Sequence, residues 1–203
     1  MTLVGTPTLF IDGEWCASSD GGRRPTYNPY DASVIMHVDE ATSNDARRAI
    51  AAAKAFFSSS DWSRRSYQDR CELLNRMADS LQKKKAELAR IETIDTGKTL
   101  GESEIDIDDV TNVFRFYAKE ALKLAEDKRV TGPLVPESVK SLVVHEPVGV
   151  CVLITPWNYP ILQLCWKLAP ALATGNVVIV KPSEVTPLST IYLLSLIHIS
   201  EPT

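Results

Sequence analysis

The sequence has no apolar run long enough to cross a lipid bilayer. Its longest runs, such as residues 148–154, are far shorter than the roughly 20 residues that a membrane-spanning helix needs. The N-terminus, MTLVGTPTLFIDGEW, also lacks the basic stretch and apolar core of a secretory signal peptide. These absences predict a cytoplasmic protein without a membrane partner.

Paired cysteines are lacking as well. No Cys-x-x-Cys motif and no histidine at a metal-ligand spacing accompanies the four cysteines, which are Cys16, Cys71, Cys151 and Cys165. The pattern predicts free thiols in a reducing compartment, not a disulfide scaffold or a zinc site. Each cysteine is interpreted as a small buried apolar side chain, not as a nucleophile.

The sequence also lacks an excess of positive charge. The 203 residues contain 22 lysines and arginines against 26 aspartates and glutamates, and the net charge is −4. This balance argues against nucleic acid or an anionic membrane surface as a partner. The sequence also has no Gly-x-Gly-x-x-Gly motif, so a bound dinucleotide would not be held by that glycine-rich turn.

The first half of the chain predicts a β-hairpin followed by helices. Asp12-Gly13 is a strong signal for a two-residue turn between two short strands. Apolar residues then recur at helical spacing in three segments. We expect one helix that begins with a cap at Ser43 or Asn44, a longer one over 66–97, and a third over 101–125.

The second half predicts strands of a parallel sheet. After a strand over 141–145, residues 148–154 are apolar almost throughout, which is typical of a strand covered on both faces. A helical stretch over 161–174 and a second buried strand, NVVIVK, follow. Strand, helix and strand in this order predict a βαβ unit and an α/β fold class.

Two polar motifs follow these two strands. Ligands of open parallel sheets bind beyond the carboxyl ends of the strands, so we expect 155–158 and 181–184 to lie near each other. Asn158 can donate an amide N–H to an oxyanion, or it can simply cap the next helix. Lys181 and Glu184 can bind ribose hydroxyls, or they can be ordinary solvated residues of a turn.

Four motifs, ITPWNYP, WKLAPALATGNVVIVKPSEVTPL, IDTGKTL and HEPVGV, resemble the NAD(P)-dependent aldehyde dehydrogenase superfamily. The residues of these motifs most resemble those of the betaine aldehyde dehydrogenases, and the resemblance covers about residues 9–193. It implies the N-terminal part of an aldehyde dehydrogenase-like fold. Its regions would be a hairpin, helical segment and oligomerisation-type strand over 1–146, and the start of the NAD-binding domain over 147–193.

The resemblance also implies roles for single residues. Asn158 would supply the oxyanion hole, and Lys167 would belong to a charge relay. NAD, or NADP as the alternative, would be bound by Ile154, Thr155, Pro156, Trp157, Lys181, Ser183 and Glu184. Glu184 would disfavour the 2′-phosphate of NADP by like-charge repulsion.

Substrate and metal residues follow from the same resemblance. Tyr159 and Trp166, seven apart and able to share a helix face, would enclose a trimethylammonium group by cation–π attraction of about 0.5–2 kcal/mol per ring. The alternative is that Trp166 packs in the core and Tyr159 only lines an entrance tunnel. A potassium site would use Thr26, Tyr27 and Asp95.

The activity implied is oxidation of betaine aldehyde or a related amino aldehyde to its carboxylic acid, with reduction of NAD(P)+ after attack by a cysteine thiolate. In the family that cysteine lies downstream of KPSE. We therefore expect an inactive N-terminal fragment of a homodimeric or homotetrameric parent, with a non-native tail over 194–203 because SLIHISEPT fits neither the preceding helix nor a next strand. The alternatives are an aldehyde dehydrogenase of other specificity and a non-catalytic nucleotide-binding fragment.

Overall fold

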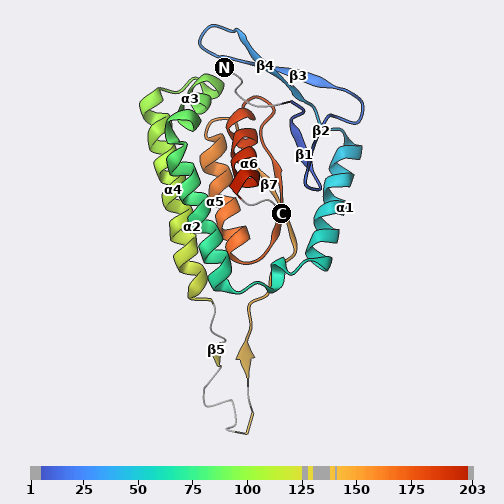
Figure 1. Ribbon diagram of the computed structural model, residues 1–203, viewed down its shortest axis with the longest axis vertical. Helices are drawn as coiled ribbons and strands as arrows, with labels where there is room; N and C mark the ends of the chain where they lie inside the picture. Colours follow the sequence, from blue (N-terminus) through green and yellow to red (C-terminus); the bar gives the residue numbers. More distant parts are fainter. Residues whose placement is uncertain (1–5, 125–127, 130–137, 140, 201–203) are drawn as a thin grey trace.

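The computed structural model describes residues 6–124, 128–129, 138–139 and 141–200 (Figure 1). In chain order the elements are β1 (Leu9–Ile11), β2 (Glu14–Cys16), β3 (Arg23–Tyr27), β4 (Val34–Asp39), α1 (Ser43–Ser59), the 3₁₀ helix η1 (Trp62–Arg64), α2 (Tyr67–Lys83), α3 (Lys85–Thr96), α4 (Leu100–Leu122), β5 (Lys128–Arg129), β6 (Leu142–Val143), β7 (Val150–Ile154), α5 (Pro160–Ala173), β8 (Val177–Lys181) and α6 (Leu188–Ser200).

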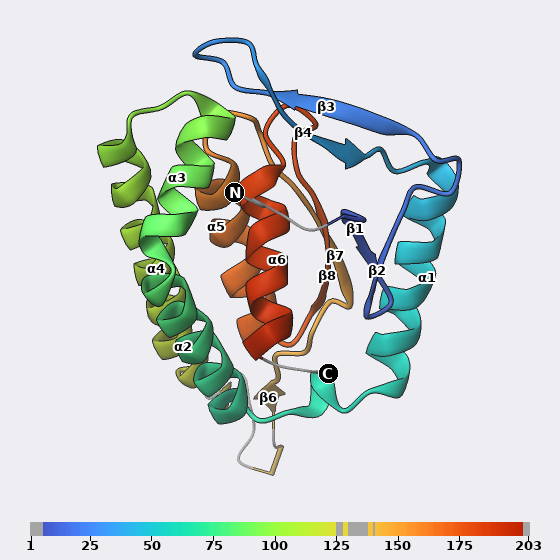
Figure 2. The ribbon, with the colours of Figure 1, turned by 45° about the horizontal axis from the view of Figure 1, so that its top comes forward.

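The elements form layers around a parallel pair of strands (Figures 1 and 2). Helices α2, α3 and α4 make one outer layer, and α5 and α6 lie between that layer and the strands β7 and β8. Helix α1 packs on the opposite side of β7 and β8. The core fills the space between the helical layers, where its largest fully buried apolar side chains are Phe114, Leu74, Leu81, Leu88, Ile91, Ile107, Ile161, Leu164, Leu188, Leu193 and Val110.

The predicted βαβ unit is confirmed. Strands β7 and β8 pair in parallel, with Val150 opposite Val177 and Ile154 opposite Lys181. Helix α5 connects them and is followed by Gly175, whose φ of 81° suits a residue without a Cβ. A Cβ at Gly175 would lie 2.5 Å from Nη1 of Arg70, so the turn packs directly on α2.

The predicted hairpin is also confirmed, because β1 and β2 pair antiparallel around Asp12 and Gly13, which both have positive φ. The cap of the first helix was predicted at the wrong residue. Thr42 is the N-cap, and its hydroxyl accepts from the N–H of Asp45 while the Asp45 carboxylate accepts from the N–H of Thr42. Asp45 also accepts from the N–H of Ser19, a contact that fixes Thr42 as the cap.

The single helix predicted over 66–97 is wrong in one respect. It begins after an N-cap at Ser66 and ends at Gly97 as expected, but it breaks at Lys84 into α2 and α3. Helix propensity at the break is good, so packing of α3 against α4 and α6 overrides it. Lys85 then forms an ion pair of 2.6 Å with Asp108 on α4.

Residues 148–154 were predicted to form a strand that is covered on both faces, and this prediction is wrong. Leu153 is buried, but Val152 and Ile154 are 54% and 60% exposed. Cys151 and Leu153 point into the core under α5, whereas the other face is covered only in part by α1. The strand over 141–145 is shorter than predicted and pairs as β6 with β5.

The C-terminal segment also differs from expectation. Helix α6 continues to Ser200, so residues 195–200 extend the preceding helix, and the non-native origin of residues 194–203 stays a prediction. Leu196 is buried in the core, which gives the continuation a packing reason. Residues 201–203 of that segment lie outside the described residues, as do residues 130–137 and 140, which precede the strand expected to serve oligomerisation. Within the described part, no helix is both long and apolar enough to span a membrane.

Candidate functional site

The ends of β7 and β8 form one rim, as the sequence predicts. The N–H of Thr155 donates to the carbonyl of Lys181 over 3.2 Å, directly after the last register pair of the strands. Further along the same loops, the hydroxyl of Thr186 donates to the carbonyl of Trp157 over 2.9 Å. The two segments predicted to bind ligand are therefore tied together, and Asn158 and Lys181 come from adjacent strand ends.

Lys181 and Glu184 form an exposed charge pair at this rim. Their Nζ and Oε2 atoms are 3.6 Å apart, and more than half of each side chain is exposed. The pKa of Glu184 is lowered by its own backbone N–H and then by the Lys181 ammonium, so it carries its negative charge. An accessible ammonium and carboxylate side by side can donate to and accept from vicinal ribose hydroxyls.

Two other predicted residues, Lys167 and Ser183, have structural contacts at the rim. Lys167 donates from Nζ to the carbonyl of Ile154 over 2.9 Å and so holds the end of β7. Ser183 is buried, and its hydroxyl accepts from the N–H of Val185. The charge relay proposed for Lys167 and the cofactor contact proposed for Ser183 stay predictions.

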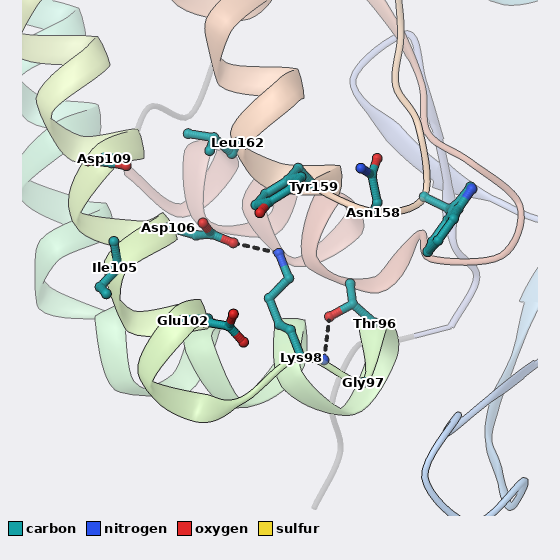
Figure 3. A pocket seen from close by; sticks show the side chains of 11 residues that line it. Thr96, Gly97, Lys98, Glu102, Ile105, Asp106, Asp109, Asn158, Tyr159 and Leu162 are labelled. Atoms are coloured by element: carbon teal, nitrogen blue, oxygen red, sulfur yellow. Dashed lines mark hydrogen bonds and ion pairs between the residues drawn. The ribbon is translucent and has the colours of Figure 1, made fainter.

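A pocket of about 630 Å³ lies beside Asn158 (Figure 3). It is open to solvent and bordered by the end of α3, the first half of α4 and the start of α5. Its lining residues are Thr96, Gly97, Lys98, Glu102, Ile105, Asp106, Asp109, Trp157, Asn158, Tyr159 and Leu162.

Asn158 is free to bind a ligand in this pocket. The alternative interpretation, that it caps a helix, is wrong, because Tyr159 occupies the N-cap position of α5. Asn158 is exposed, and its side-chain amide has no hydrogen bond within the described residues. Figure 3 shows it next to Tyr159 on the wall opposite Glu102.

Lys98 is the central charged group of the pocket. Its Nζ lies 2.5 Å from Oδ2 of Asp106 and 3.6 Å from Oε1 of Glu92. The same Nζ lies 4.1 Å from the centroid of the Tyr159 ring. Only 12% of the Lys98 side chain is exposed, so this ammonium is held inside the pocket wall (Figure 3).

Sequence reasoning missed Lys98 and the acidic wall. A signal was available, because Glu102, Asp106 and Asp109 are spaced by four and three and therefore share a helix face. Lys98 gave no such signal, since its contacts with Tyr159 and Glu92 depend on how α3 and α5 meet.

The two predicted substrate aromatics lie differently from expectation. Tyr159 lines the pocket, but as the N-cap it precedes α5 and has a φ of −138°, so the argument that both share one helix face is wrong. Trp166 lies on α5 outside the pocket lining. Its exposure of 49% also contradicts the alternative that it packs in the core.

Asp95, one of the residues proposed to bind potassium, directly precedes Thr96 of the pocket lining. Oδ1 of Asp95 is buried without a hydrogen-bond partner among the described residues, while Oδ2 accepts from the N–H of Leu188 over 2.8 Å. Burial raises the pKa of Asp95 to about 8. Thr26 is buried, and its hydroxyl donates to the carbonyl of Met36, whereas Tyr27 is exposed. A buried carboxylate oxygen without a hydrogen-bond partner, such as Oδ1 of Asp95, can serve as a ligand of a cation.

One contact and one absence bear further on this proposed cation site. The ring of Pro29 lies against Gly97, where a Cβ would be 2.7 Å from Cγ, so the loop after β3 reaches the end of α3. The described residues contain no cluster of three histidine, cysteine, aspartate or glutamate side chains that could hold a metal.

Known proteins match this chain over nearly its whole length. The family model "Aldehyde dehydrogenase family" matches residues 15–201. The chain is 45% identical to betaine aldehyde dehydrogenase of Bacillus subtilis over 94% of this chain, and 42% identical to retinaldehyde dehydrogenase 3 of Mus musculus over 93%. A solved structure of betaine aldehyde dehydrogenase from Staphylococcus aureus in complex with NAD+ matches 97% of this chain with 43% identity and a TM-score of 0.90.

The matched proteins are much longer than this chain. It spans 38% of the Bacillus enzyme, 36% of the mouse enzyme and 38% of the Staphylococcus structure. The family match over residues 15–201 nevertheless covers the rim motifs and the pocket. The chain belongs to the aldehyde dehydrogenase family.

Proposed function

We propose that this chain supplies the ribose-binding and oxyanion-binding residues of an NAD-dependent aldehyde dehydrogenase acting on an aldehyde that carries an amino or quaternary ammonium group. The reaction would oxidise the aldehyde to its carboxylic acid. Family membership supports the reaction class, and the match to a betaine aldehyde dehydrogenase supports the substrate class.

The acidic pocket beside Asn158 is the observation that carries the substrate proposal. Three carboxylates, Glu102, Asp106 and Asp109, line it against the single ammonium of Lys98. Tyr159, which is 44% exposed, adds an aromatic ring to the same wall. An excess of negative charge in the wall of the pocket favours a cationic ligand over a neutral one of the same shape.

Asn158 would position the reacting end of the substrate. Its unoccupied side-chain amide can donate a hydrogen bond to the aldehyde oxygen, whose negative charge grows as a nucleophile attacks. Because Lys167 holds the carbonyl of Ile154, the backbone that leads to Asn158 starts from a fixed point. A fixed donor requires less reorganisation when charge develops.

The cofactor proposal is based on the charge pair at the end of β8. Lys181 and Glu184 would bind the adenosine ribose, with Ile154 to Trp157 along the cofactor and Ser183 beside them. NAD, when bound, supplies the hydride acceptor. The charged Glu184 carboxylate favours NAD over NADP, because it would repel a 2′-phosphate.

The nucleophile is proposed to be none of the four cysteines of this chain. Cys165 is fully buried, and burial raises the pKa of its thiol, as does nearby Glu92. Cys71 is buried in the core, Cys151 lies within β7, and Cys16 lies within β2. Residues 1–203 alone should therefore form no NADH from an aldehyde.

A potassium ion is proposed at Asp95, with backbone oxygens of Thr26 and Tyr27. The unpartnered Oδ1 of Asp95 and the approach of the Pro29 loop to Gly97 support it. If the ion binds, potassium chloride should raise the melting temperature more than sodium chloride at equal ionic strength. The variant Asp95→Asn should lose this difference, and equal effects of both salts on the wild type would contradict the site.

The test of function compares two aldehydes of equal shape in the full-length protein. Betaine aldehyde and 3,3-dimethylbutanal differ only in the atom that carries the three methyl groups. This atom is a positively charged nitrogen in betaine aldehyde and a neutral carbon in 3,3-dimethylbutanal. We expect NADH formation with kcat/KM higher for betaine aldehyde. A preference for the neutral aldehyde would support the second candidate, an aldehyde dehydrogenase of other specificity, which the match to a retinaldehyde dehydrogenase favours.

A non-catalytic nucleotide-binding protein would bind NAD in calorimetry and oxidise neither aldehyde. The cytoplasmic location and the homodimeric or homotetrameric state of the full-length protein stay predictions. Size-exclusion chromatography with light scattering would measure the latter.

A further inference from the structure

Lys98 holds a position that a cationic ligand would otherwise take. Its ammonium lies 4.1 Å from the centroid of Tyr159 and 2.5 Å from a carboxylate oxygen of Asp106. These are the two kinds of group, an aromatic face and an anion, that bind an ammonium ligand in proteins. The ammonium of Lys98 therefore already lies over the ring of Tyr159, which lines the pocket (Figure 3).

The position of Lys98 is fixed from more than one side. Glu92, which is fully buried, lies 3.6 Å from Nζ and faces it from α3, whereas Asp106 faces it from α4. With only 12% of its side chain exposed, Lys98 cannot swing into solvent without leaving the buried Glu92 carboxylate unpaired. The ammonium is thus held in the pocket wall between α3 and α4.

We propose that Lys98 is a specificity-determining residue of this pocket, whose ammonium occupies the cation position on the Tyr159 ring and lowers the affinity of the pocket for a ligand's positive charge. This inference rests on the proposed function for its substrate class. It assigns the two remaining carboxylates, Glu102 and Asp109, to the charged end of the substrate, because Asp106 is already neutralised by Lys98.

The direction of the effect follows from charge and shape. Replacing Lys98 by a neutral residue removes one positive charge from the wall and frees the ring face and Asp106. The dissociation constant of a small quaternary ammonium should fall about tenfold, as expected for a unit charge at about 10 Å in an effective dielectric constant of about 20. A neutral ligand of equal shape should bind equally well before and after the change.

The test is a titration of the full-length protein with tetramethylammonium, and with tert-butanol as the neutral ligand, followed by NMR. Lys98→Gln removes the charge but can still donate to Asp106. Lys98→Met repeats the measurement with a side chain of similar length and no polar group, in case Gln does not fold. Lys98→Arg keeps the charge and is the matched control.

The expected result is tighter tetramethylammonium binding by the Gln and Met variants, unchanged binding by Arg, and no change for tert-butanol. Unchanged or weaker tetramethylammonium binding in the folded neutral variants would overturn the proposal. A purely structural role would lower the melting temperature without changing the preference for the cation. Absence of NADH formation with every aldehyde would refute the proposed function but not this inference, because the titration needs no turnover.

Discussion

The carboxylate of Asp95, at the end of α3, accepts a hydrogen bond of 2.8 Å from the backbone N–H of Leu188, the first residue of α6. The two residues are 93 positions apart, and both are almost completely inaccessible to solvent. The bond satisfies one of the free N–H groups at the start of a helix. It couples α6 to a titratable group in the core.

Asp95 makes the stability of the fold depend on pH. Burial, and to a lesser degree nearby Glu92, raises the pKa of Asp95 to about 8, from its ordinary value of 3.8. Between these values the folded state binds more protons than the unfolded state, so the free energy of unfolding falls as pH rises and then levels off. The Asp95 contribution to this loss should be on the order of a few kcal/mol.

Asp95→Asn keeps an acceptor for Leu188 and removes the titration. Urea denaturation of wild type and variant at about pH 5 and at about pH 8, in buffers without potassium, measures the difference. The variant should lose less stability than the wild type between the two pH values. Parallel pH profiles would show that Asp95 is not the group responsible.

Two phenylalanines on α4 provide a matched pair for the core. Phe114 is fully buried between the helices, whereas Phe116 is 57% exposed. Phe114→Ala should lower the free energy of unfolding by about 3–5 kcal/mol, because it leaves a cavity. Phe116→Ala should lower it by less than about 1 kcal/mol. Similar losses in thermal or urea denaturation would contradict the packing of α4.

The capping box of α1 can be tested with adjacent residues. Thr42→Ala removes the acceptor for the N–H of Asp45 and should cost about 0.5–2 kcal/mol. Ser43→Ala, at the position that the sequence suggested for the cap, should change stability by less than about 0.5 kcal/mol because Ser43 is exposed. A larger loss at Ser43 than at Thr42 in denaturation curves would place the cap one residue later.

Two asparagines separate a proposed catalytic role from a structural one. Asn158→Ala should lower kcat of the full-length protein about 10²–10³-fold, as loss of one oxyanion donor does, with little change in melting temperature. Asn176 accepts from the N–H of Gly149 and donates to the hydroxyl of Thr174. Asn176→Ala should therefore lower stability by about 1–3 kcal/mol. A drop in melting temperature for Asn158→Ala without loss of kcat would refute its role.

Local signals in the sequence were enough to predict the βαβ unit and the rim. Apolar runs, a glycine after the helix, and the polar motifs after each strand are properties of short segments. The cap at Thr42 was missed by one residue, since threonine, serine and asparagine all cap helices and the choice is made by the distant contact of Asp45 with Ser19. Likewise, the break at Lys84 arises from packing, which the periodicity of one helix does not contain.

The pocket shows the same limit more clearly. Tyr159 was expected to face a ligand cation, and its ring instead carries the ammonium of Lys98. That pair forms because the α3–α4 junction folds over the start of α5. The spacing of the acidic residues in the sequence indicates that they share one face of α4. Their contact with Lys98 depends on the tertiary structure and could not be predicted from that spacing.

The contact of Gly175 with Arg70 limits how this chain can be recombined with other proteins. The guanidinium of Arg70 stacks on Tyr67 and fills the space beside the turn that connects α5 to β8. Residues 147–193 therefore carry a recess shaped by a side chain from the helical half. A chimera that transplants this segment onto another scaffold must therefore include a residue equivalent to Arg70. Without it, a cavity would remain beside the turn at Gly175 between α5 and β8.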